Sequence, residues 1–435
     1  MKYSIYNEFI NDTENDKIAY LFNTLREKYF ILDIRLKELI IAGKDNISII
    51  KESHPTLYKY LLLEKFIVPD YMDEVSECVL KLKKKFSTST NLRITINPTL
   101  DCNLNCWYCY EKHLKNSCMT KSTIEALGHY IEYEIQSKNI KNIQLCFFGG
   151  EPLLKYKQVV RPVIQQYNEI CLKYKKALKL HFTTNGVCLT HTVVNELKEL
   201  SSEVAVQIAF DGNKDLHNSI KHFSNGKGCY DIVKKQLFYA IKKGLMITIR
   251  CNYTLSNFDS FRELIMECKE FWHYPNVRFS FHKVWQEPES EALFAKRESL
   301  KQDILKFGIQ SNIDSFWGDS LVPCYADFDN NIIVNYNGDI YKCTARDFNP
   351  EHRLGYLTSS GKIIYNDLAT KRNKNRLTQK CLKCRILPIC TICFQQRSEA
   401  KCDTCPSPHT SENASINISK YFYDVLALKR RQSGV

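Results

Sequence analysis

The chain has 435 residues, of which 44% are hydrophobic and 25% are charged, which is typical of a globular protein with two or three domains. It contains no run of eighteen apolar residues and no apolar signal core at its N-terminus, so we expect no membrane partner and a cytoplasmic location. In that compartment metal ligation explains the 19 cysteines better than disulfides do. The formal charge of +13 is spread over short lysine groups without a base-reading motif, which argues against nucleic acid and favours an acidic peptide partner.

Residues 1–88 are predicted to form a small α+β module of their own. Alternating apolar residues predict paired strands at Tyr3–Ile10 and Tyr29–Ile34, with turn residues between them. Helical patterns follow at Arg35–Ala42 and Ile47–Leu63, the second interrupted by a proline. This order suggests a winged-helix-like module, which either binds a peptide along a strand edge or is a plain scaffold.

Residues 89–288 are predicted to form the central α/β domain, because strands and helices alternate along them. Six such repeats with short loops predict a parallel sheet curled into a partial (β/α)6 barrel. In that architecture the active site lies where the carboxyl ends of the strands meet their loops. The predicted strands are Leu92–Ile96, Ile143–Phe148, Leu178–Thr183, Val204–Phe210, Met246–Asn252 and Val277–Val284, and the predicted helices are Ser122–Gln136, Tyr156–Tyr174, Thr192–Leu200, Tyr230–Lys243 and Phe258–Phe271.

Three cysteines follow the first of these strands with the spacing C-x3-C-x2-C, at Cys102, Cys106 and Cys109. Chance predicts about 0.04 such spacings in a chain with this cysteine content. Three thiolates on one short loop can ligate three irons of a [4Fe–4S] cube and leave the fourth iron open. The alternatives are three unrelated buried thiols or a zinc knuckle.

Glycine or polar residues also follow the later strands. Gly149 and Gly150 allow close approach of a ligand, and Glu151 could hold an ammonium group. Asn185 after the third strand could bond ribose hydroxyls or backbone, and Arg250 in the fifth could meet a carboxylate or a ribose. Each signal is weak alone, because such sequences are more often plain turns. Together, at consecutive strand ends of one barrel, they indicate a single binding site.

The cysteine loop and the glycine motif together resemble those of the radical S-adenosylmethionine (SAM) enzymes. The spacing of Cys102, Cys106 and Cys109 matches that superfamily, and the Gly-Gly-Glu-Pro motif that ends at Pro152 matches its motif for the SAM ammonium. By this resemblance the open iron binds SAM, and reductive cleavage of SAM gives a 5′-deoxyadenosyl radical that removes hydrogen from the substrate.

Further residues match the same superfamily. Tyr108 stands where the family has an aromatic residue that packs near the adenine. Asp211, followed by a glycine and by His217, resembles the Asp-Gly…His element of the branch that modifies peptides and proteins. The resemblance covers residues 92–285 and implies that Tyr108 and Asp211, with Asn185 and Arg250, bind SAM.

The C-terminal third has a cysteine signature of its own. The pattern Cys324-x13-Gly338-x4-Cys343 frames a predicted hairpin of Ile332–Tyr336 and Asp339–Cys343. Pairs with C-x2-C spacing follow, and such pairs alone would indicate zinc sites. These pairs are Cys381 with Cys384, Cys390 with Cys393, and Cys402 with Cys405.

This arrangement resembles the SPASM domain, which follows a radical SAM barrel and holds two auxiliary [4Fe–4S] clusters. By that resemblance the expected ligands are Cys324, Cys343 and Cys393 for the first cluster, and Cys381, Cys384, Cys390 and either Cys402 or Cys405 for the second. The chain departs from the family at Cys390, where the usual spacing is C-x3-C. The first cluster has only three expected ligands, so its open iron could bind a substrate thiolate. The remaining expected segments are a helical linker at 289–320, the SPASM domain at 321–410 and a C-terminal helix at 411–435.

The resemblance implies a maturase that acts on a ribosomally made precursor peptide, held by its leader, and forms a thioether or carbon–carbon crosslink. It also implies a flavodoxin or ferredoxin as electron donor and three [4Fe–4S] clusters with SAM as cofactors. One alternative is an anaerobic sulfatase-maturing enzyme, although Thr344 stands where that group has an Asp base. A non-catalytic iron–sulfur peptide-binding protein is the other. The general base is not identified, and the candidates are His217, His282 and Asp347.

Overall fold

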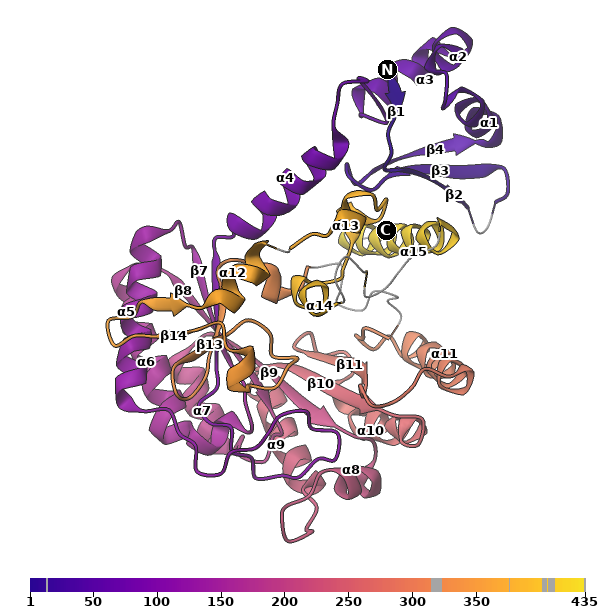
Figure 1. The fold of residues 1–435 in the computed structure, drawn as a ribbon. Helices are drawn as coiled ribbons and strands as arrows, with labels where there is room; N and C mark the ends of the chain where they lie inside the picture. The colour runs from indigo at the N-terminus through magenta and orange to yellow at the C-terminus, as the bar shows by residue number, and fades with distance from the viewer. Residues whose placement is uncertain (13–14, 314–322, 375, 401–404, 406–410, 434–435) are drawn as a thin grey trace. The chain divides into compact units, whose positions relative to one another are not determined.

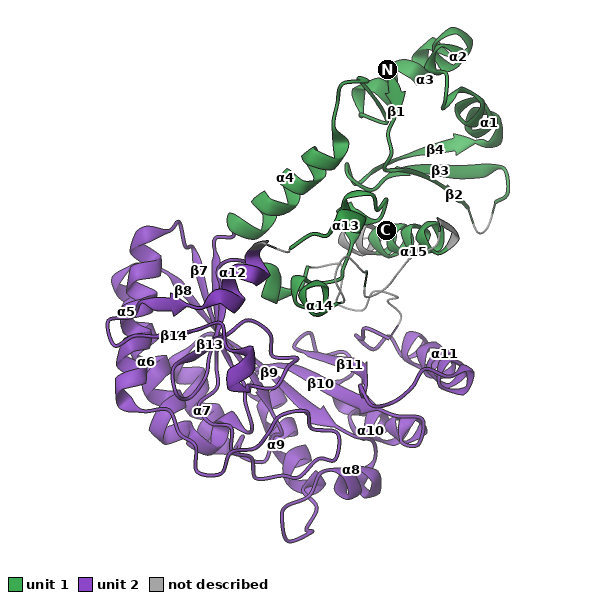
Figure 2. Ribbon diagram, viewed as in Figure 1, with its two compact units in different colours: residues 1–88, 315–327, 375–435 green, residues 89–314, 328–374 purple. Residues whose placement is uncertain are grey.

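The structure is a computed structural model that describes residues 1–12, 15–313, 323–374, 376–400, 405 and 411–433. The chain forms two compact units, one from residues 1–88, 315–327 and 375–435 and the other from residues 89–314 and 328–374 (Figure 2). The first predicted boundary, after residue 88, coincides with a junction between the units. The segment predicted as one SPASM domain, residues 321–410, contributes residues to both.

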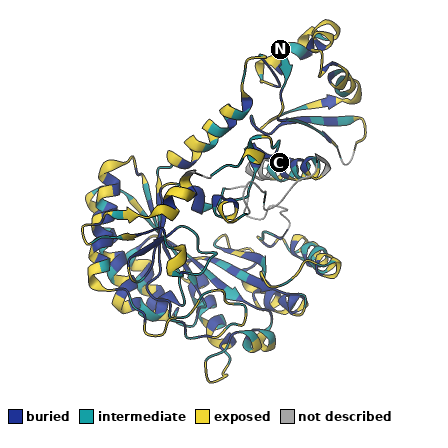
Figure 3. Cartoon of the chain, in the orientation of Figure 1, coloured by how far each residue is buried: buried dark blue, intermediate teal, exposed yellow. Residues whose placement is uncertain are grey.

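The larger unit contains a ten-stranded sheet in the order β11-β10-β9-β8-β7-β6-β12-β13-β14-β15 (Figure 1). Strands β6 to β11 are parallel, and their bounds agree with the predicted ones to within one residue. Their apolar side chains are buried along most of their length (Figure 3), as expected for parallel strands covered on both faces. These strands are β6 (Asn91–Ile96), β7 (Asn142–Phe147), β8 (Ala177–Thr184), β9 (Glu203–Phe210), β10 (Met246–Tyr253) and β11 (Val277–Lys283).

Helices connect these strands and form the outer layer of the larger unit (Figure 1). Side-chain oxygens of Thr120, Thr190 and Ser290 accept backbone N–H groups at the starts of α5, α7 and α11, which explains why the helices begin there. The helices between the parallel strands are α5 (Lys121–Ser137), α6 (Arg161–Lys173), α7 (His191–Leu200), α8 (Lys214–Ile220), α9 (Tyr230–Lys242) and α10 (Phe261–Glu267), whereas α11 (Glu291–Lys306) follows β11 and α12 (Asp367–Lys374) follows β15.

The predicted C-terminal hairpin is confirmed, as β12 (Asn331–Val334) and β13 (Asp339–Tyr341). Its position was not predicted: β12 pairs in parallel with β6, so the hairpin extends the barrel sheet. Two short antiparallel strands, β14 (Gly355–Leu357) and β15 (Ile363–Tyr365), continue that sheet. Strands of three residues are too short to show a clear period in the sequence.

The smaller unit begins with an antiparallel sheet in which the central strand was not predicted. We expected residues 3–10 to pair with residues 29–34, and that is wrong, because β3 lies between β2 and β4 and pairs with both. The apolar run of β3 is largely buried on both faces and therefore does not alternate. The strands are β1 (Lys2–Tyr3), β2 (Asn7–Asn11), β3 (Ile18–Asn23), β4 (Lys28–Asp33) and β5 (Ile67–Val68), with β1 paired to β5.

In the smaller unit, the helical pattern predicted over residues 47–63 is divided into two helices at His54, as the proline predicted. The unit contains α1 (Ile34–Gly43), α2 (Ile47–Ser53), α3 (Pro55–Leu63), α4 (Glu74–Ser87), α13 (Gln379–Leu382), α14 (Phe394–Glu399) and α15 (Ser411–Ser433). Ile10 and Phe22 of the N-terminal sheet share a core with Ile418 and Phe422 of α15. The N-terminal module and the C-terminal helix therefore fold as one body. None of the helices in the described ranges is long and apolar enough to cross a membrane.

Replacing Leu145 by Ala should destabilise the larger unit. Leu145 is fully buried in β7, so the substitution leaves a cavity and should lower the free energy of unfolding by about 2–5 kcal/mol. Leu172→Ala is the matched control, because Leu172 in α6 is 79% exposed, and its effect should stay within about 0.5 kcal/mol. Urea denaturation followed by circular dichroism measures both. Equal effects would contradict the placement of β7 in the core.

Candidate functional site

The loop of residues 97–120 follows β6, and side chains from the ends of neighbouring strands hold it. The ends of β7, β8 and β10 each contribute a hydrogen bond to this loop, and the segment after β9 contributes another. The predicted site residues of the barrel therefore meet at one end of the sheet, as the strand order requires.

The three thiols of this loop differ in exposure. Cys102 is buried, Cys106 is half-buried and Cys109 is exposed. Burial raises the pKa of Cys102 to about 12, with nearby Glu151 and the other two thiols adding to the rise. Without iron these thiols stay protonated, and binding of a metal would release their protons.

Each of the three sulfurs has a nitrogen close by, which suits a group that carries negative charge on sulfur. Among the described residues no three His, Cys, Asp or Glu side chains converge closely enough to hold a single metal ion. Thiols that each bind a different iron of one cube need not converge in that way. The sulfur–nitrogen pairs are Cys102 with Asn185 Nδ2 at 3.8 Å, Cys106 with Lys221 Nζ at 3.6 Å and Cys109 with His113 Nε2 at 3.6 Å.

The two glycines after β7 pack against the cysteine loop itself. A Cβ atom at Gly149, where φ is +103°, would lie 2.5 Å from Thr99 O, and one at Gly150 would lie 2.3 Å from Asp101 O. Glu151 N donates to Asp101 O at 2.8 Å. We expected these glycines to permit close approach of a ligand. The close approach in the structure is that of the loop backbone, which no side chain would allow.

Glu151, which follows β7, links the ends of β7 and β8 through hydrogen bonds. It is fully buried, and its carboxylate accepts hydrogen bonds from Leu153 N (3.0 Å), Thr184 Oγ1 (2.8 Å) and Asn185 N (2.8 Å). Burial raises the pKa of Glu151 to about 7, although these bonds partly oppose the rise. A carboxylate has about four acceptor sites, so these bonds occupy most of them. Pro152 begins the 3-10 turn that follows.

The other predicted barrel residues meet around the hydroxyl of Tyr108. This hydroxyl donates to Asp211 Oδ1 at 2.7 Å and accepts from Lys221 Nζ at 2.6 Å and from Asn252 Nδ2 at 3.0 Å. Arg250 Nε donates to Asn252 Oδ1 at 2.8 Å. The structure thus links Tyr108, Asp211 and Arg250 in one network, and it adds Lys221, which sequence reasoning missed.

Lys221 is the only buried lysine in the described part of the chain. Burial lowers its pKa, but Asp211, Tyr108 and Cys106 outweigh that effect and raise the pKa well above its usual range, so the side chain is an ammonium. The only sequence signal would have been its position four residues after His217 in the Asp-Gly…His element. That position alone does not show that a lysine is buried.

The three candidate bases lie at separate places in the larger unit. His217 is buried in α8, where its Nδ1 accepts from Asp211 N at 3.4 Å, and burial lowers its pKa to about 4. His282 Nε2 lies 2.8 Å from Ser280 Oγ in β11, and burial lowers its pKa to about 3. Asp347, after β13, pairs with His352 at 2.6 Å. The buried His217 and the half-buried His282 are therefore neutral at pH 7.

Exposed aromatic side chains flank the cysteine loop. The rings of Tyr110 and Trp285 are stacked, with centroids 5.2 Å apart and an interplanar angle of 16°. The guanidinium of Arg346 lies 5.9 Å from the centre of the Trp285 ring. Tyr110 also donates from its hydroxyl to Thr344 O at 2.8 Å. The segments after β11 and β13 therefore both contact the cysteine loop.

The C-terminal cysteines of the smaller unit form two neighbouring sets. A hydrogen bond between the two thiols lowers the pKa of Cys393 and raises that of Cys324, so these two thiols are in contact. Burial and the charges of three further thiols raise the pKa of Cys384, and those thiols are Cys390, Cys381 and Cys405. Cys343 lies in the larger unit, where its Sγ accepts from Ala345 N at 3.4 Å. Cys402 lies outside the described residues.

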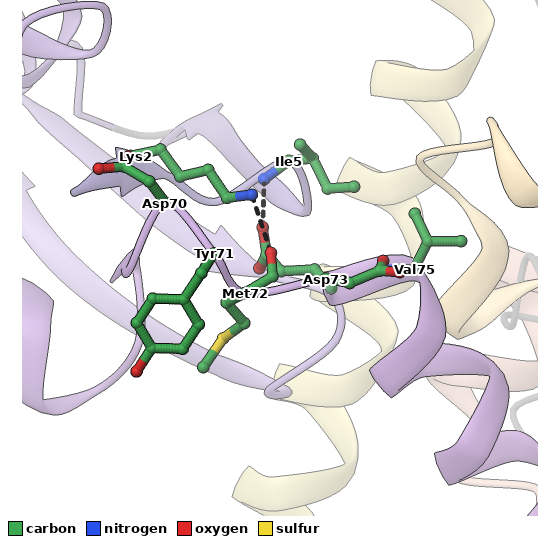
Figure 4. A pocket seen from close by; sticks show the side chains of 8 residues that line it. Lys2, Ile5, Asp70, Tyr71, Met72, Asp73 and Val75 are labelled. Carbon is green, nitrogen blue, oxygen red and sulfur yellow. Dashed lines mark hydrogen bonds between the residues drawn. The ribbon is translucent and has the colours of Figure 1, made fainter.

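A separate cavity of ≈ 290 Å³ lies in the smaller unit, between β1 and the start of α4 (Figure 4). Lys2 Nζ donates to Met72 O at 2.8 Å there, and Ile5 N donates to Glu74 Oε2 at 3.1 Å. Its lining contains none of the predicted site residues. This cavity is therefore not part of the cysteine-loop site.

The sequence was compared with known proteins. Residues 96–268 match the Radical SAM superfamily. The radical SAM cyclopropyl synthase TigE of Paramaledivibacter caminithermalis is 32% identical over 130 residues, which are 27% of this chain and 26% of that protein. A cysteine-type anaerobic sulfatase-maturating enzyme of Clostridium novyi (strain NT) is 20% identical over 391 residues, which are 79% of this chain and 99% of that protein.

Two solved structures share the fold. Native anSMEcpe with bound AdoMet and Kp18Cys peptide has a TM-score of 0.57 at 18% identity, over 79% of this chain and all of that chain (100%). SuiB of Streptococcus suis bound to S-adenosylmethionine has a TM-score of 0.51 at 19% identity, over 90% of this chain and 95% of that one. The superfamily match implies a [4Fe–4S] cluster and SAM as cofactors of residues 96–268. Residues 96–268 of this chain, which form most of its α/β barrel, are therefore a Radical SAM domain.

Proposed function

We propose that this enzyme is a radical SAM/SPASM maturase that modifies a ribosomally made precursor peptide and forms a thioether or carbon–carbon crosslink. The observation that carries the proposal is the gathering of Cys102, Cys106 and Cys109 on one loop, which the ends of three strands and the segment after β9 hold by hydrogen bonds. We propose a cytoplasmic location, where reducing conditions keep the cysteines as thiols, and a flavodoxin or ferredoxin as electron donor.

In this proposal the three loop thiols hold the [4Fe–4S] cluster that binds SAM. When bound, SAM supplies the 5′-deoxyadenosyl radical that removes a hydrogen atom from the peptide. Asn185, Tyr108 and Arg250 line the place where the loop meets the strand ends and would orient SAM. Glu151 has one acceptor site left for its ammonium group.

The C-terminal thiols would hold two auxiliary clusters. Contact between Cys324 and Cys393 supports their shared role in the first cluster, with Cys343 as the expected third ligand. The grouping of Cys405 with the thiols at 381, 384 and 390 supports Cys405 as the fourth ligand of the second cluster. Such clusters would accept the electron that the substrate loses, so the overall change is a two-electron oxidation.

The N-terminal module would bind the leader of the peptide along β4. Among the described strands only β3 pairs with β4, so the other edge of β4 is open to an added strand. Lys28 of β4 forms an ion pair with Glu64 at the end of α3, and Ile31 of β4 and Leu63 of α3 are exposed. An apolar leader segment could bury both side chains.

A second candidate is sulfatase maturation, because the Clostridium novyi relative aligns along almost its whole length. That activity would convert a Cys or Ser of a sulfatase to formylglycine. Co-expression with the peptide of the shortest neighbouring reading frame separates the two candidates. If the peptide loses the mass of two hydrogens and one of its thiols no longer reacts with an alkylating reagent, the product is a thioether. The same mass loss with all thiols still reactive indicates a carbon–carbon bond. An unchanged peptide together with an oxidised sulfatase substrate would contradict the maturase proposal.

Replacing Cys106 by Ala should remove the SAM-binding cluster. We expect the anaerobically reconstituted variant to lose about four irons and all 5′-deoxyadenosine formation, because two thiolates cannot hold the cube. Cys146→Ala is the matched control, since Cys146 is a buried thiol within β7. This variant should keep its full iron content and its 5′-deoxyadenosine formation. Iron and sulfide analysis with chromatography of the SAM products measures the result. Full iron content in Cys106→Ala would refute this ligand assignment.

Replacing Cys384 by Ala should remove one auxiliary cluster and leave SAM cleavage intact. The variant should also lose about four irons, yet still form 5′-deoxyadenosine, because the cysteine loop is unchanged. Peptide product should fall below a tenth of the wild-type amount, since the substrate electron loses its acceptor. Normal product formation with the cluster absent would contradict an electron-accepting role.

Replacing Ile31 by Asp should weaken binding of the precursor peptide at least tenfold without affecting SAM cleavage. The charge would lie beside the open edge of β4, where the leader is proposed to add. Leu80→Asp on α4 is the matched control, because Leu80 is 65% exposed and Ile31 is 64% exposed. Fluorescence anisotropy of the labelled leader measures both. Equal affinities of the two variants would argue for the scaffold interpretation of the module.

A further inference from the structure

The buried cation Lys221 contacts one of the three loop thiols. Lys221 is 4% exposed, and its Nζ lies 3.6 Å from Cys106 Sγ. By contrast, the nitrogen beside Cys102 belongs to the neutral amide of Asn185, and the histidine beside Cys109 lies at an exposed thiol. Cys106 is therefore the loop thiol that touches a buried full positive charge.

The position of this ammonium is fixed from several sides. Asp211 is fully buried, and its Oδ2 lies 3.2 Å from Lys221 Nζ. The Tyr108 hydroxyl accepts from Nζ at 2.6 Å, and Nζ also lies 5.0 Å from the centre of the Tyr108 ring. Lys221 N donates to His217 O at 2.6 Å, which holds the backbone at the end of α8. The ammonium is thus positioned before any cofactor binds.

A charge in this position acts on the sulfur with little screening. Two charges a few ångströms apart interact several times more strongly in a protein interior than in water. One-electron reduction adds one negative charge to an iron–sulfur cluster, and much of that charge is carried by its sulfurs. Hydrogen bonds to those sulfurs and nearby charges are known to tune such potentials. The ammonium in direct contact with Cys106 stabilises the reduced form, and the Asp211 carboxylate that pairs with it at 3.2 Å offsets part of this effect.

We propose that Lys221 is a positioning residue that raises the reduction potential of the [4Fe–4S] cluster at Cys106. It thereby favours the one-electron reduction that must precede SAM cleavage. In that step an external one-electron reductant loses one electron and the cluster gains it, so the charge of the cluster falls by one. The inference rests on the proposed function, because it requires a cluster on the loop thiols.

The test is a potentiometric titration of the holoenzyme with dithionite, followed by electron paramagnetic resonance. The signal of interest is the one that Cys106→Ala lacks. In Lys221→Met the equilibrium constant for reduction should fall about tenfold, which is about 59 mV for one electron. Lys221→Arg keeps the charge and should stay within about twofold of the wild type.

Lys214→Met is the matched control. Lys214 begins the same helix and forms an ion pair with Asp231 at 2.7 Å, but its side chain is 57% exposed. The variant removes one lysine charge from the start of α8, whereas Lys221 directly follows the end of that helix, and solvent screening should leave the cluster potential unchanged. If Lys221 had only a structural role, Lys221→Met would lower the iron content or the stability of the protein. The reduction potential of the molecules that still hold the cluster would then equal that of the wild type.

A second pair of variants covers the case that Lys221→Met does not fold, since it leaves Asp211 buried without its cation. Asp211→Asn/Lys221→Met should show a lower potential than Asp211→Asn alone. Equal potentials within either pair, with iron content unchanged, would overturn the inference. If Cys106→Ala instead kept every signal, the cluster would not be on this loop, and the proposed function would fail together with the inference.

Discussion

The site depends on one steric constraint, the contact between the backbone of residues 99–101 and the two glycines after β7. A Cβ atom at either glycine would overlap a carbonyl oxygen of that segment. Because the glycines lack one, the loop can lie against the strand end and accept the hydrogen bond from Glu151 N. The loop that carries the three thiols is thereby attached to the rigid sheet. A metal cluster needs its ligands at fixed positions, and this contact supplies that rigidity.

Nitrogen donors accompany the thiols in both units. Lys221 Nζ contacts Cys106 in the larger unit, and Arg397 Nη2 donates to Cys390 Sγ at 3.2 Å in the smaller one. Both cations are buried residues, and burial of a charge is unfavourable unless a partner compensates it. Thiolates bound to iron would be such partners. Lys221 already pairs with Asp211 at 3.2 Å, so burial by itself favours a thiolate partner only for Arg397, which supports a role for Cys390 as a ligand.

The N-terminal module shares its cores with the C-terminal cysteine segment. Tyr6 and Leu25 of the module pack in one cluster with Leu387, against which Cys381 and Cys384 also lie. In the proposed function, the element that would hold the leader and the thiols of one auxiliary cluster belong to one folded body. Unfolding of the module would therefore also disturb that cluster, because the two share buried side chains.

The sequence by itself determined the six parallel strands, the interruption before α3, the hairpin near Asn337 and the spacing of the loop cysteines. These features follow from periodicity and from motifs within short stretches of chain. Only the tertiary structure decided that β3 lies between β2 and β4, that β12 pairs with β6 and that the glycines face the cysteine loop. It also revealed Lys221 beside a thiol 115 residues earlier in the chain. Pairing partners, burial and the charge beside a ligand depend on segments that meet only in the folded chain, so no local pattern encodes them.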